Sequence, residues 1–143
     1  MLLRSIFLGF LAAVACAATA ANGMRQVVAP VDPPVYITNQ SAGPVKVMWQ
    51  TVWPHKALSP QREATVPAGA ADLKARRGVI WYVHPGSGKA VENMLFVSIV
   101  DANGRQIAQK AADEAVTGPL AALEAKALHI TVGAGLAIKL STK

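Results

Sequence analysis

The sequence has few of the residues on which covalent catalysis and metal binding depend. Of its 143 residues one is a cysteine, Cys16, and three are histidines, His55, His84 and His129, with no HxH or HxxxH spacing. A single cysteine cannot form an internal disulfide or a zinc site made of several thiolates. The eight acidic residues are scattered and offer no carboxylate pair suited to glycoside hydrolysis. We therefore predict that the protein is not an enzyme and needs no cofactor.

Long apolar runs are also missing, apart from one near the amino terminus. Residues 5–15 are mostly apolar, Arg4 precedes them, and small residues lead to an Ala-Thr-Ala triplet at 18–20. A charged start, a short apolar core and a small-residue exit are typical of a secretory signal peptide, and a membrane span would need roughly 20 apolar residues. We predict that residues 1–20 are a signal peptide and that the mature protein is exported, to the bacterial periplasm or as a secreted protein.

The same segment admits a second interpretation. Residues 13–16, Ala-Val-Ala-Cys, resemble the lipobox of a bacterial lipoprotein, in which cleavage precedes a lipidated cysteine. The chain would then be a structural envelope lipoprotein, anchored to the outer membrane through Cys16 and acting within an assembly. Contact with a membrane is expected only in this second case. Both interpretations place the folded part outside the cytoplasm.

Acidic residues are outnumbered by basic ones. The chain holds 14 Lys and Arg against 8 Asp and Glu, which gives a formal net charge of +6. A basic exported protein favours acidic partners, such as a polyanionic glycan or an anionic surface. No nucleic acid is expected as a partner.

The residues after the signal peptide read mostly as short strands. Apolar and polar side chains alternate with a period of two, which is typical of strands with one buried face. Asn103-Gly104 predicts a hairpin turn, and a second hairpin closes the chain. The expected strands cover residues 35–39, 45–53, 62–66, 72–76, 79–83, 94–100, 105–109, 128–132 and 136–140.

These segments predict an all-β fold. We expect an antiparallel β-sandwich of about seven to nine strands over residues 35–143, with Trp49 and Trp81 in its core. The alanine-rich residues 111–127 predict a short helical insertion. Residues 21–34 contain several prolines and predict a linker or N-terminal arm.

Four short motifs follow one another at a suitable spacing between residues 35 and 99. They are Asn39-Gln40-Ser41, a strand from Val45 to Trp49, Pro67-Ala68-Gly69, and Arg77-Gly78-Val79-Ile80-Trp81. Together they resemble the β domain of the von Hippel-Lindau tumour-suppressor family. The resemblance implies a β-sandwich that binds an extended peptide.

The resemblance does not extend to the hydroxyproline pocket of that family. Trp81 is retained, whereas Glu63, Ala75 and Val79 stand near or at the places of the family's Tyr, Ser and His. The resemblance therefore supports the fold and a binding role, not hydroxyproline as the ligand.

Aromatic and basic side chains predicted to face away from the core are the candidate contact residues. Tyr82 and His84 alternate with core positions, and Trp53 ends a strand beside a proline. Lys74 and Arg76 add positive charge nearby. Such side chains suit an extended peptide, a glycan or a polyanion docked across the sheet or along an edge strand.

We thus predict an exported, non-catalytic recognition module with contacts at Trp53, Lys74, Arg76, Tyr82 and His84. A third alternative is a metal carrier or enzyme that uses the histidines. Copper held by His55, Met48 and Met94 is one form of that alternative.

Overall fold

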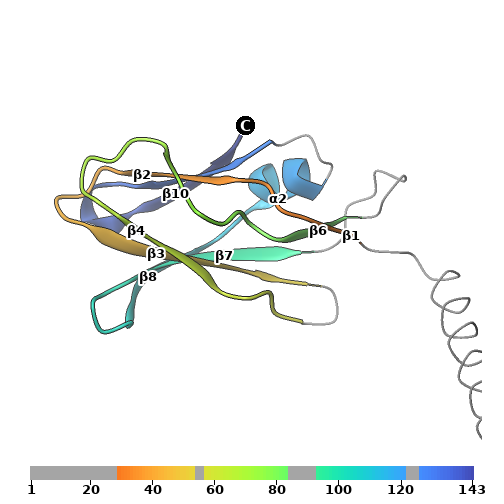
Figure 1. Ribbon diagram of the computed structural model, residues 1–143, viewed down its shortest axis with the longest axis horizontal. Helices are drawn as coiled ribbons and strands as arrows, with labels where there is room; N and C mark the ends of the chain where they lie inside the picture. Colours follow the sequence, from red (N-terminus) through yellow and green to blue (C-terminus); the bar gives the residue numbers. More distant parts are fainter. Residues whose placement is uncertain (1–28, 54–56, 84–92, 122–125) are drawn as a thin grey trace, which may run out of the picture.

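The computed structural model describes residues 29–53, 57–83, 93–121 and 126–143. They form an all-β sandwich with one short α-helix (Figure 1), which confirms the predicted fold class. The described residues contain ten strands, more than predicted, because residues 29–31 of the predicted arm form an additional strand; the strands found within 72–76 and 79–83 are shorter than predicted. The elements are β1 (Ala29–Val31), β2 (Val35–Asn39), β3 (Val45–Val52), β4 (Arg62–Val66), β5 (Leu73–Lys74), β6 (Trp81–Val83), β7 (Met94–Val100), β8 (Gln106–Ala111), α2 (Glu114–Ala121), β9 (Leu128–Val132), the 3₁₀ turn η2 (Ala134–Leu136) and β10 (Ile138–Thr142).

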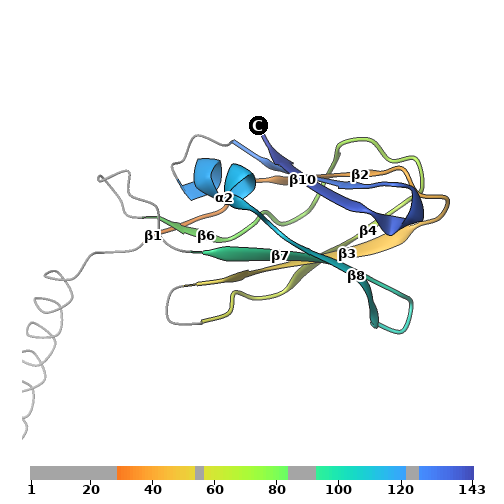
Figure 2. The same cartoon turned by 180° about the vertical axis from the view of Figure 1, so that it is seen from behind.

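Two four-stranded sheets face each other (Figures 1 and 2). Sheet I has the strand order β4-β3-β7-β8 and is antiparallel throughout. Sheet II has the order β10-β9-β2-β5. Strands β2, β4, β7 and β9 begin and end at the predicted residues.

One pairing in sheet II differs from the predicted antiparallel arrangement. β2 and β9 run parallel, with Val35 opposite Leu128 and Asn39 opposite Val132. Parallel neighbours need a long connection between them, and here all of sheet I lies between β2 and β9 along the chain. Alternation identified both strands, but it carries no information about their relative direction.

The end of the predicted N-terminal arm takes part in the fold. β1 pairs antiparallel with β6, with Val31 opposite Trp81 and Pro30 opposite Tyr82. Asn93, just before β7, bonds both backbone polar groups of Tyr82: its Nδ2 donates to the carbonyl oxygen at 3.0 Å, and its Oδ1 accepts from the amide at 3.4 Å. The two-stranded ribbon of β1 and β6 is thereby joined to sheet I.

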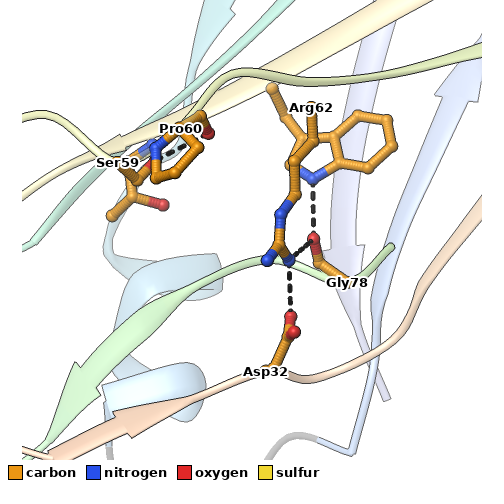
Figure 3. Close-up of polar contacts among 7 residues, drawn as sticks. Asp32, Ser59, Pro60, Arg62 and Gly78 are labelled. Carbon is orange, nitrogen blue, oxygen red and sulfur yellow. Dashed lines mark hydrogen bonds and ion pairs between the residues drawn. The ribbon is translucent and has the colours of Figure 1, made fainter. Parts of the chain in front are cut away.

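A bend between β5 and β6 is held by the carbonyl oxygen of Gly78. This oxygen accepts hydrogen bonds from Trp49 Nε1 at 2.9 Å and from Arg62 Nη1 at 2.6 Å (Figure 3). The indole of Trp49 therefore satisfies its donor while the ring stays in the core, 2% exposed.

The core lies between the sheets, where the predicted alternation places it. Trp49, Trp81 and Ile37 are among the largest fully buried side chains. α2 lies at the end of the sandwich that holds β1 and β6 (Figures 1 and 2), where it contacts β6 and β10, and its Val116 and Leu120 join the core. The predicted helical insertion is confirmed within residues 114–121, while Ala111 belongs to β8. No helix in the described parts of the chain is long and apolar enough to span a bilayer.

Candidate binding face

The predicted contact residues do not form one patch. Trp53 and Tyr82 contact each other edge to face, with ring centroids 4.3 Å apart. Lys74 lies on β5 opposite Tyr36 of sheet II, whereas Tyr82 lies on β6 opposite Pro30 in the two-stranded ribbon. The lysine and the aromatic pair therefore belong to different sheets. His84 lies outside the described residues.

Trp53 is placed for packing more than for contact. It is half-buried, and its indole nitrogen is shielded from solvent with no hydrogen-bond partner in the described residues. The backbone of its neighbour Tyr82 is held by Asn93. Two other residues of the resemblance, Trp81 and Val79, are 0% exposed and are therefore not available to a ligand.

Hydrogen-bonding side chains cover the solvent side of sheet II. Because β2, β9 and β10 each alternate, their apolar residues face the core and the residues between them face outward. We call this surface the sheet II outer face. Its central members are Tyr36, Thr38, His129, Thr131 and Ser141.

At the centre of this face, two rings stack across neighbouring strands. The rings of Tyr36 and His129 are 5.2 Å apart and within 16° of parallel. Nδ1 of His129 lies 3.4 Å from Oδ1 of Asp72. The amide of Asp72 donates to the hydroxyl of Thr38 at 3.0 Å, and its backbone has a positive φ of 47°. The carboxylate thus lies beside the imidazole, and one face of each ring is covered by the other.

Basic side chains flank the rings along both edges of the sheet. Lys74 lies on β5, and Arg76 follows it with buried Ala75 between them, so both are on the outward side. On the other edge, Lys139 lies on β10 and Lys143 directly follows that strand. At about 4.8 Å between strands, the two edges are about 14 Å apart.

Positive charge without a carboxylate partner is concentrated here. Lys46, Arg62 and Arg105 pair with Glu63, Asp32 and Asp101 at 3.2, 2.7 and 3.7 Å. Among the described residues, the other basic side chains make no ion pair with a carboxylate. They are Lys74, Arg76, Arg77, Lys110, Lys126, Lys139 and Lys143. Lys110 lies on β8 of sheet I, and the others lie on strands of sheet II or on the short segments that precede or follow those strands.

The sequence analysis names Lys74 and Arg76 as candidates but does not name the lysines of the opposite edge. Lys139 alternates with Ile138 and Leu140, so the signal was present in the terminal hairpin. The contact between Asp72 and His129 carried no sequence signal, because the two residues are distant in the chain.

Two hollows lie at the turns of the sandwich. One, of about 660 Å³, is lined mainly by apolar residues that include Ile99, half-exposed Ile107 and Leu136, whose φ is 64°. The other, of about 600 Å³, lies at the turn between β9 and β10 and is lined by Gln40, Lys110, Thr131, Gly133, Ala134, Ala137, Ile138 and Lys139.

The metal alternative gains no geometric support. Within the described ranges no three His, Cys, Asp or Glu side chains are grouped to hold an ion. Met94 lies opposite Val52, four positions from Met48 on β3, so the two methionines are about 13 Å apart. His55 lies outside the described residues.

A scan against protein-family models gives no match for this chain, and a search of the curated proteins finds no significant relative.

Proposed function

We propose that the protein is an exported, non-catalytic recognition module that binds an anionic glycan across the sheet II outer face. The observation that carries this proposal is the concentration of unpaired Lys and Arg along both edges of that face. Surface charges without partners raise the local potential and attract an oppositely charged polymer.

The side chains between the two edges favour an anion over a neutral sugar. Tyr36, His129 and the hydroxyls of Thr38, Thr131 and Ser141 supply hydrogen-bond donors. A neutral sugar is better matched to exposed ring faces, and the central rings here cover one face of each other. A polymer with acidic groups on both sides would reach Lys74 and Lys139 at once.

Binding to a sulfated polysaccharide tests the proposal, with a neutral polysaccharide of equal length beside it. We expect the double variant Lys74→Gln and Lys139→Gln to weaken the sulfated complex roughly tenfold, since each exposed charged contact contributes about 0.5–1 kcal/mol. A matched control, Lys46→Gln with Arg105→Gln, removes the same charge from sheet I and the turn before β8. Equal weakening by both pairs would show a response to net charge alone and would refute the proposed face.

We propose export through the signal peptide of residues 1–20, with the Cys16-anchored lipoprotein as the alternative. The intact mass of the protein from its native host distinguishes them. A chain that begins near Ala21 in the soluble fraction supports the free module. A chain that begins at Cys16 with acyl chains supports the anchored form, and Cys16→Ser would then abolish membrane association.

A further inference from the structure

The hollow at the turn between β9 and β10 brings the edges of the two sheets together. It is about 600 Å³ in volume and takes lining residues from both sheets. β8 and β10, which are the edge strands of sheets I and II, contact each other. The turn supplies the small residues Gly133, Ala134 and Ala137, which leave room beside it.

Two lysines from different sheets line this hollow. Lys110 lies opposite Val97, whose side chain is in the core, so Lys110 is on the side of β8 that faces sheet II. Lys139 lies on the outer side of β10. Neither lysine has a carboxylate partner in the described residues.

The rest of the lining supplies donors and no negative charge. The hydroxyl of Thr131 and the side-chain amide of Gln40 make no hydrogen bond within the described residues. Two like charges placed in one hollow repel each other, and a bound anion would relieve that repulsion.

We infer that this hollow is a subsite for a sulfate or phosphate group, held by Lys110 and Lys139. The inference rests on the proposed function and names the acidic group that the glycan carries. A phosphate monoester has a charge of about −1.5 to −2 and three acceptor oxygens, enough for two ammonium groups and the Thr131 hydroxyl. A sulfate ester carries one charge, as a carboxylate does, but it offers three acceptor oxygens where a carboxylate offers two, so a sulfated or phosphorylated polymer binds more tightly than a uronic acid polymer of equal charge.

Titration of the full mature chain with inorganic sulfate and inorganic phosphate, followed by amide NMR, tests this subsite. We expect saturable shifts at Lys110, Thr131 and Gly133, at least tenfold weaker binding in Lys110→Gln, and recovery in Lys110→Arg. Acetate should shift these amides only at much higher concentration. The control variant Lys74→Gln should bind sulfate as the wild type does, and unchanged circular dichroism shows that the variants are folded.

The outcomes separate the subsite from the proposed function. The subsite is refuted if sulfate and phosphate give no saturable shift, or if Lys110→Gln binds them as the wild type does. Either result refutes the subsite even if Lys74→Gln still weakens binding of the polymer. Saturable sulfate binding by Lys110 in a protein that binds no polymer supports the subsite and refutes the proposed function.

Discussion

Nη1 of Arg62 lies 2.7 Å from Oδ1 of Asp32, so a side chain of sheet I is joined to the segment between β1 and β2. The same nitrogen donates to the carbonyl oxygen of Gly78 (Figure 3). One guanidinium thus connects β4, the N-terminal segment and the bend before β6. The two partners differ in burial, because the Arg62 side chain is 14% exposed and that of Asp32 is 53% exposed.

This difference predicts unequal costs when either partner is replaced. Arg62→Met removes a buried donor and should lower the free energy of unfolding by about 1–3 kcal/mol. Asp32→Asn removes a half-exposed charge and should cost less than about 1 kcal/mol. Urea denaturation measures both, and a larger loss from Asp32→Asn would contradict the prediction.

The structure leaves no room for a methyl group at Gly78. A Cβ placed there would lie 2.2 Å from the carbonyl oxygen of Pro33 and 2.6 Å from Oδ1 of Asp32. We expect Gly78→Ala to destabilise the protein by at least about 1–3 kcal/mol, the usual range for overpacking. Gly43→Ala is the matched control, since nothing lies within 4 Å of its Cβ. Equal thermal midpoints for the two variants would show that the backbone shifts without cost.

The buried side chain of Asn39 should not tolerate conversion to aspartate. Its Nδ2 donates to the carbonyls of Gly43, Val66 and Pro67 at 2.9–3.2 Å, and its Oδ1 accepts from the amide and hydroxyl of Ser41. Asn39→Asp keeps the shape but places a charge against three acceptors, and we expect a loss of about 3 kcal/mol.

Ser41→Ala provides the comparison for Asn39→Asp. It removes one hydroxyl from the same network and should cost about 1 kcal/mol. Chemical denaturation of both variants shows which one loses more stability. The prediction fails if the Asn39→Asp variant is more stable than the Ser41→Ala variant.

Asp72→Asn should act on binding and not on stability. The carboxylate is 64% exposed, so loss of its contact with His129 should change the free energy of unfolding by less than about 0.5 kcal/mol. Asparagine also tolerates the positive φ at this position. Removal of this acidic group beside the rings should raise affinity for a sulfated polysaccharide about twofold. A drop in affinity, measured by calorimetry, would mean that Asp72 orients His129 for the ligand.

The local pattern of the sequence predicted most strands and the core, because each strand alternates on its own. Met94–Val100 and Leu128–Val132 were identified to the residue for this reason. The pairing of strands was harder to predict from the sequence. The prolines near Ala29–Val31 indicated an arm, yet that segment pairs with β6. The basic edge at Lys74 was predicted, whereas the meeting of Lys110 and Lys139 depends on how the two sheets pack, which no short segment encodes.

The parallel pairing of β2 with β9 sets an order of folding. Every strand of sheet I lies between residues 45 and 111, but sheet II joins residues 35–39 to residues 128–132. The pairing of β2 with β9 closes a long loop, which is slow because the chain loses conformational entropy before the stabilising contacts between the two strands form. A chain that has emerged only as far as α2 can complete sheet I, but β9 and β10 are still missing from sheet II, so the apolar inner face of sheet I stays partly uncovered. The protein is therefore most prone to aggregate until β9 and β10 have joined sheet II and covered that face.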